Sequence, residues 1–171
     1  SIVGYATAYY KYHARAAFMC AHLNKVTASA APGTEQEIDD IKKEIRNDGI
    51  AITGCDINDS KSRYTARDKK TIVTGLNAIS GLGEKAIESI FACQPFESFP
   101  DFIYRTSSAV NKNVVIALAK SGAFDRFKLP RKYIVGLFED PTTGKKIRDR
   151  INKLGDAAAK AGTPPDWSQL S

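Results

Sequence analysis

The sequence lacks any run of about 18 consecutive apolar residues, the minimum for a membrane-spanning helix. It also lacks a charged N-terminal region followed by a long apolar run, which argues against a secretory signal peptide. Cysteine and histidine are scarce, at three and two residues in 171. An odd number of widely spaced cysteines argues against a disulfide framework and against paired metal ligands. We therefore expect a reducing, cytoplasmic location, no membrane contact, and no metal or other cofactor in this chain.

Methionine is almost absent as well. Met19 is the only one, and the chain opens at Ser1 directly in a helical pattern. We therefore expect a piece of a longer protein. A chain of 171 residues has room for one ordinary domain or two small ones, and 43% hydrophobic with 26% charged residues predicts that it folds.

Acidic residues are missing from residues 1–34, and bases are concentrated near the other end of the chain. Lysine and arginine total 25 against 19 acids, a net charge of +6. Residues 107–153 alone contain eleven bases and four acids, a net of +7. Basic charge gathered in one segment favours a polyanionic partner, most often nucleic acid. A solvated basic face that keeps the protein soluble is an equally good explanation of the charge alone.

Apolar residues recur at helical spacing in the first fifty residues. One stripe predicts an amphipathic helix over residues 2–23, followed by a loop at 26–33. Thr34 and Glu37 have the capping-box spacing and predict a helix that ends at Gly49. The stripe consists of Ile2, Tyr5, Tyr9, Tyr12, Ala16, Met19 and Leu23.

Residues 50–75 differ, because β-branched residues at 50–53 and 71–74 enclose turn-forming residues; they predict short strands or extended loops. From residue 76 onward the pattern is helical, with Ser98 and Asn111 as expected N-caps. A turn at 140–144 precedes the last helix, and residues 162–171 are expected to form a mobile end or a linker. The predicted helices span residues 84–93, 99–105, 112–121 and 131–138, and the last one carries Ile147, Ile151, Leu154 and Ala158.

The most informative motif is a pair of glycines, Gly81 and Gly83, on either side of Leu82. Glycine adopts backbone angles that side chains disfavour and lets another backbone come close, while an inward Leu82 would lock the turn. The N–H groups around residues 83–85 would be unpaired donors at a helix start, suited to a phosphate oxygen. We therefore predict phosphate contacts at Ser80, Gly81, Leu82, Gly83 and Lys85. A tight glycine turn between two packed helices is the structural alternative, whereas the missing third glycine excludes a dinucleotide fingerprint.

This pattern resembles the helix-hairpin-helix motif of DNA-binding proteins that do not read sequence, with Ala86 and Ile90 at its two apolar positions. A second, degenerate unit covers residues 99–121, where a plain helical turn is the alternative. In that unit Asn111, Lys112 and Asn113 would take the place of the glycine turn. The sequence thus predicts a mainly α fold of short helices, with a tandem helix-hairpin-helix unit and a small β element near residues 50–75.

A wider resemblance extends over about residues 1–127, to the C-family replicative polymerases represented by the DNA polymerase III alpha subunit. It rests on the order and spacing of seven short segments. Arg15 departs from it, because the family usually has proline there, and Ala17 stands near the place of an acid. The segments are residues 5–13, 17–19, 45–50, 56–58, 75–83, 110–112 and 121–125.

The resemblance implies that the aspartates holding the catalytic Mg²⁺ ions lie upstream in the parent polymerase. This chain has none of them, so we do not expect it to polymerise alone. It implies a helical end of the fingers region at 1–33 and a helix-hairpin-helix DNA-binding region at 34–127. Nothing is carried over to residues 128–171, where charge and helical spacing predict a basic helical extension with a mobile tail.

Two functions follow as hypotheses. The first is a module that binds the backbone of double-stranded DNA without reading sequence and positions it for the remainder of the polymerase. The second is an interaction module that docks on the polymerase core or on a sliding clamp through Leu137 and Phe138. The alternative for that pair is a buried helix face. No Ser/His/Asp grouping, carboxylate pair or P-loop favours an independent enzyme.

Overall fold

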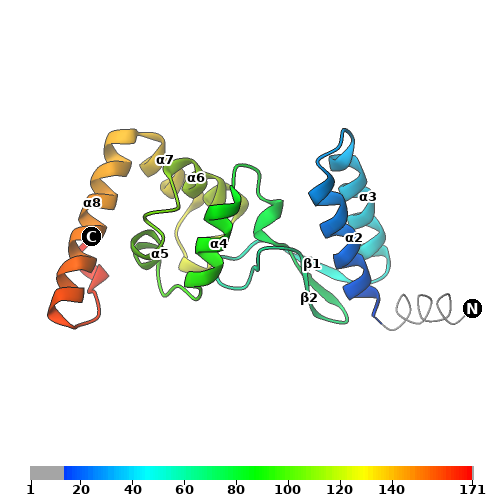
Figure 1. Ribbon diagram of the computed structural model, residues 1–171, viewed down its shortest axis with the longest axis horizontal. Coiled ribbons are helices and arrows are strands. Elements are labelled where there is room, and N and C mark those ends of the chain that lie inside the picture. The colour runs from blue at the N-terminus through cyan, green and yellow to red at the C-terminus, as the bar shows by residue number, and fades with distance from the viewer. Residues whose placement is uncertain (1–13, 171) are drawn as a thin grey trace, which may run out of the picture. The chain divides into compact units, whose positions relative to one another are not determined.

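The computed structural model describes residues 14–170, which form two compact units (Figure 1). In the described range, the first unit comprises residues 14–55 and 59–78, and the second comprises residues 56–58 and 79–170. The part of the first predicted helix that precedes residue 14 lies outside the described residues. The predicted three-part division, which follows motifs and charge rather than packing, stays a prediction.

Helix α2 (Arg15–Ser29) is longer at its C-terminal end than predicted. Residues 26–29 were expected in a loop, but they continue the helix because Val26 extends the buried stripe of Met19 and Leu23. The hydroxyls of Thr27 and Ser29 donate to the carbonyls of Leu23 and Val26, at 2.7 and 2.8 Å. Bonds of this kind let polar side chains end a helix without leaving donors unpaired.

Helix α3 (Thr34–Asn47) begins at the predicted residue, but the predicted capping box is wrong. Gly33, with φ of 86°, is the N-cap, and the Thr34 hydroxyl donates backward to the carbonyl of Ala31 at 2.5 Å. Thr34 already has helical geometry, so its side chain does not reach the N–H of Glu37, which donates to the Gly33 carbonyl instead.

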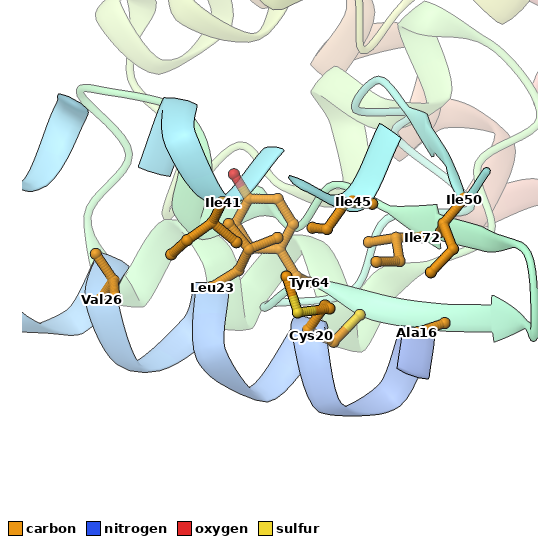
Figure 2. Packing of buried hydrophobic residues seen from close by; sticks show 10 residues of the cluster. Ala16, Cys20, Leu23, Val26, Ile41, Ile45, Ile50, Tyr64 and Ile72 are labelled. Carbon is orange, nitrogen blue, oxygen red and sulfur yellow. The ribbon is translucent and has the colours of Figure 1, made fainter. Parts of the chain in front are cut away.

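The first unit places α2 and α3 against a three-stranded sheet. Two of its strands lie in the predicted β-branched segments, and the third lies between them, where turn-forming residues were expected. The strand order is β1 (Ala51–Thr53), β3 (Thr71–Val73) and β2 (Thr65–Asp68). Strand β1 runs parallel to β3 with Ile52 opposite Ile72, and β2 is antiparallel to β3. Figure 2 shows the core between helices and sheet, formed by Ala16, Cys20, Leu23, Val26, Ile41, Ile45, Ile50, Tyr64 and Ile72.

Burial in this core sets the chemistry of Cys20. The residue is 5% exposed, and burial raises the pKa of its thiol to about 11. Because the thiolate is the reactive form, Cys20 is protonated and inert near pH 8, whereas Cys55 and Cys93 are partly exposed. Alkylation at pH 8, resolved by peptide mass spectrometry, is expected to modify Cys55 and Cys93 well before Cys20. The difference is expected to vanish in guanidinium chloride, and equal rates in the folded chain would contradict the burial.

The second unit packs its helices around a cluster of phenylalanines. Phe102 makes edge-to-face contacts with Phe96 at 5.1 Å and with Phe124 at 5.0 Å between ring centroids, the geometry that aromatic pairs prefer. Phe99 makes the same kind of contact with Phe138. The helices are α4 (Glu84–Cys93), α5 (Phe99–Arg105), α6 (Lys112–Ser121), α7 (Arg131–Glu139) and α8 (Pro141–Ala161).

One prediction near the C-terminal end is wrong, and another stays a prediction. The residues expected to form a turn at 140–144 instead open α8, because the Asp140 carboxylate accepts from the N–H groups of Thr142 and Thr143. The expected mobile tail contains a 3₁₀ turn, Trp167–Leu170, that packs on α8. The Trp167 ring lies 6.0 Å from that of Tyr104, so its aromatic surface has a partner. Within residues 14–170, no helix is both long and apolar enough to cross a bilayer.

Candidate nucleic-acid interface

The first hairpin turn, residues 79–83, leads into α4 within the second unit, and the 3₁₀ turn Leu76–Ala78 precedes it in the chain at the end of the first unit. Gly81 has a φ of 92°, in the left-handed region that favours glycine. Gly83 has φ −76° and ψ 159°, angles that any residue adopts, so of the two glycines only Gly81 uses the conformational freedom of glycine. Gly83 is instead the N-cap of α4, a position that has no steric need for glycine.

The turn is open to solvent. Ser80, Gly81, Gly83 and Lys85 are exposed, and Leu82 is half-buried. Within residues 14–170, no side chain caps the first turn of α4, because its N-cap is a glycine. The Gly83 carbonyl accepts from the N–H groups of Ala86 and Ile87, at 3.0 and 3.1 Å. The N–H groups before Ala86 have no acceptor within the helix, since a helix leaves its first donors unpaired.

The electrostatics of this turn combine favourable and opposing charges. The positive end of the α4 dipole and the ammonium of Lys85 favour an anion. Glu84, the acidic residue in the first turn, carries a carboxylate that opposes one. An anion held here is therefore bound by backbone donors and the dipole more than by net charge.

Ala86 and Ile90, the two apolar positions of the motif, are 4% and 0% exposed. They form the packing face of α4, as expected from the spacing. The opposite face carries Lys85, Glu88 and Phe91, with Phe91 49% exposed. The helix is thus anchored by its apolar side while its N-terminus stays accessible.

The second hairpin, α5 and α6, has a different N-terminus at its second helix. Ser98 caps α5 by accepting from the N–H of Asp101 at 3.3 Å, and Asn111 caps α6 by accepting from the N–H of Val114 at 3.0 Å. Both predicted caps are confirmed. Asn111 thereby uses its side-chain oxygen within the protein, whereas Lys112 and Asn113 are exposed. The cap satisfies one first-turn donor of α6, so this turn offers the side chains of Lys112 and Asn113 together with the backbone donors that remain at the helix start.

The two hairpins meet at Gly81. A Cβ built on this glycine would lie 3.9 Å from the Cβ of Ala117 in α6. Ala117 follows Asn113 by one helical turn and shares its face of the helix. The structure thus places the first glycine turn beside the helix whose N-terminus carries the other predicted site residues, Asn111, Lys112 and Asn113.

Comparison with known proteins agrees with this geometry. Residues 49–134, half of the chain, match the protein family described as helix-hairpin-helix motif. The chain belongs to the helix-hairpin-helix family. Its relatives include the DNA polymerase III subunit alpha of Pseudomonas aeruginosa, 35% identical over 73% of this chain, and that of Bacillus subtilis, 33% identical over 74%. The subunit from Neisseria meningitidis serogroup B is 31% identical over 99% of this chain.

These relatives confirm the resemblance to C-family polymerases. The alignments cover 11% of the subunits from Pseudomonas aeruginosa and Bacillus subtilis, and 16% of that from Neisseria meningitidis. The chain therefore spans only a small part of the curated relatives it matches.

Some of the basic side chains in residues 107–153 contact other side chains of the second unit. Arg126 pairs with Asp56 at 3.1 Å and Arg131 with Asp125 at 2.6 Å. Arg148 lies 5.6 Å from the centre of the Phe138 ring, and burial lowers the pKa of its guanidinium. The other eight bases of residues 107–153 are exposed: Lys112, Lys120, Lys128, Lys132, Lys145, Lys146, Arg150 and Lys153.

The structure corrects one site hypothesis. Leu137 and Phe138 were considered as a pair that a sliding clamp could accept. Phe138 is 0% exposed and packs edge-to-face on Phe99 at 6.0 Å. Reaching a partner would require exposing this ring to solvent, at a cost of roughly 1.5–3 kcal/mol for a buried phenylalanine. The buried helix face is therefore the correct interpretation of Phe138, whereas Leu137 is half-buried.

Proposed function

We propose that this chain is a module of a C-family replicative DNA polymerase that binds duplex DNA by its sugar-phosphate backbone, without reading sequence. The observation that carries the proposal is the exposed, glycine-capped N-terminus of α4 in a helix-hairpin-helix fold. Backbone N–H groups at a helix start bind phosphate oxygens, which every base sequence presents alike.

The second hairpin contributes differently. Asn111 satisfies the N–H of Val114, so this turn would reach phosphates through Lys112, the side-chain amide of Asn113 and the backbone donors that remain at the start of α6. The contact at Gly81 and Ala117 links both turns, so one unit can hold a strand at two points. In this proposal the module positions DNA for the remainder of the polymerase, which supplies nucleotidyl transfer and the Mg²⁺ that it requires.

A salt titration tests this function. The affinity for two labelled duplexes of unrelated sequence, measured by fluorescence anisotropy between about 50 and 200 mM salt, is expected to be equal for both. The logarithm of the affinity is expected to fall linearly with the logarithm of salt concentration, by about 0.9 for each phosphate contacted. A strong preference for one sequence, or an affinity independent of salt, would contradict backbone binding.

Contact with another part of the polymerase is a second candidate. It is favoured by an apolar groove of about 290 Å³ beside Tyr133, a side chain that is 56% exposed. Phe99, Leu137 and Ile151 line this groove, and Leu170 of the C-terminal turn contributes to it. Tyr133→Ala separates the two candidates, because it removes aromatic surface without changing the charge that duplex binding requires.

A further inference from the structure

A cavity of about 390 Å³ lies between α6 and α7, outside both hairpin turns. Lys120 of α6 and Arg131 and Lys132 of α7 line it, together with one acid, Glu139. The two lysines are exposed, and Glu139 lies two helical turns beyond Lys132 along α7. The cavity is therefore cationic at the end where the two helices approach the turn that joins them.

Arg131 is held in place at this end. Its Nε and Nη2 donate to the two carboxylate oxygens of Asp125, at 3.0 and 2.6 Å. Three of the five N–H groups of the guanidinium remain outside this pair. The guanidinium lies over Gly122, where a Cβ would come within 2.5 Å of Nη2. Because Gly122, with a φ of 87°, has no side chain, the Arg131 guanidinium can lie close to its backbone.

The cavity shares a face of α6 with the hairpin contacts. Asn113, Ala117 and Lys120 are spaced by four and three residues, so they lie along one side of the helix. Ala117 faces the Gly81 turn, and Lys120 follows it by about 4.5 Å along the helix axis. Lys120, at the cationic end of the cavity, therefore lies on the same side of α6 as the residue that faces the first hairpin turn.

We propose that this cavity is a third phosphate-binding point for the same duplex. Lys120 and Lys132 would contact the phosphate directly, and Arg131, oriented by Asp125, would add donors from its free side. The inference rests on the proposed function, because the ligand is the DNA backbone that the hairpins hold. It gives a role to part of the basic extension beyond residue 128, for which neither the motifs nor the family resemblance supplied one.

The test compares two double variants of the full chain by the same salt titration. Lys120→Ala/Lys132→Ala is expected to weaken binding roughly tenfold and to reduce the slope of log affinity against log salt by about 2, one for each lysine. The control, Lys153→Ala/Lys160→Ala on exposed positions of α8, removes the same charge elsewhere in the second unit. It is expected to leave the slope nearly unchanged. Thermal unfolding checks that all proteins are folded.

The possible results separate this inference from the function on which it rests. If the unmodified chain does not bind duplex DNA, the proposed function fails and the third contact fails with it. If the chain binds and a Gly83→Asp variant binds weakly, but Lys120→Ala/Lys132→Ala keeps the original slope, only the third contact is overturned. Equal losses in the test and control pairs would also overturn it, because they would show an effect of net charge.

Discussion

Replacing Gly83 by aspartate is expected to lower the affinity for duplex DNA by about ten- to a hundredfold without destabilising the fold. The backbone angles of Gly83 suit any residue, and a Cβ there would meet no described atom within 4 Å. Aspartate is a preferred N-cap, so its carboxylate would accept from the first-turn N–H groups of α4. It would occupy the donors that the proposed function assigns to phosphate and add a repelling charge.

The control for this variant is Gly54→Asp, which makes the same chemical change at an exposed glycine in the first unit. Gly54 also has open space for a Cβ and no left-handed angle. Fluorescence anisotropy with labelled duplex measures affinity, and thermal unfolding measures stability. We expect Gly83→Asp to unfold at the same temperature as the unmodified chain or slightly higher. If the two variants bind duplex DNA with equal affinity, the α4 N-terminus is not part of the binding site.

Gly75→Ala is expected to lower the free energy of unfolding of the first unit by about 3 kcal/mol, the upper part of the usual range for overpacking. A Cβ on Gly75 would lie 2.2 Å from the carbonyl carbon of Arg63. The obstacle is backbone rather than a flexible side chain. It is also held in place, because the N–H groups of Leu76 and Asn77 donate to the carbonyls of Lys61 and Ser62, at 2.9 and 3.0 Å.

Hydrogen exchange resolved by residue is the suitable measurement, because the two units need not unfold together. Faster exchange is expected in residues 14–55 and 59–78, with little change in residues 79–170. Gly54→Ala is the matched control, since alanine there has open space and should change stability by less than about 1 kcal/mol. Protection in the first unit that matches the unmodified chain would show that the Arg63 backbone can move aside.

The elements that the sequence predicted well share one property, which is that their signals are local. Ser98 and Asn111 were expected as N-caps, and both accept the bonds that this role requires. Ala86 and Ile90 were expected on a buried face and are buried. A cap or a helical stripe is determined by residues within one or two turns, so a single sequence reveals it.

The errors arose where a local signal competed with packing. The capping-box spacing at Thr34 was present, but Gly33 took the cap position because a left-handed turn there joins α2 to α3. Residues 26–29 look polar, yet the burial of Val26 continues α2. At residues 140–144 the turn-forming composition was present, but the Asp140 carboxylate caps α8 there instead. The predicted phosphate contacts themselves stay a prediction.

The sequence by itself determined the mainly helical content, the glycine hairpin and the kinship with C-family polymerases, because periodicity and motif spacing are written in consecutive residues. Only the tertiary structure decided which glycine needs its special angle, that Gly81 meets Ala117, and that Arg131 lies over Gly122 beside Lys120. Those contacts join residues from different helices and turns. They depend on how whole helices pack, and the sequence pattern of one helix does not say which residue of another helix it will meet.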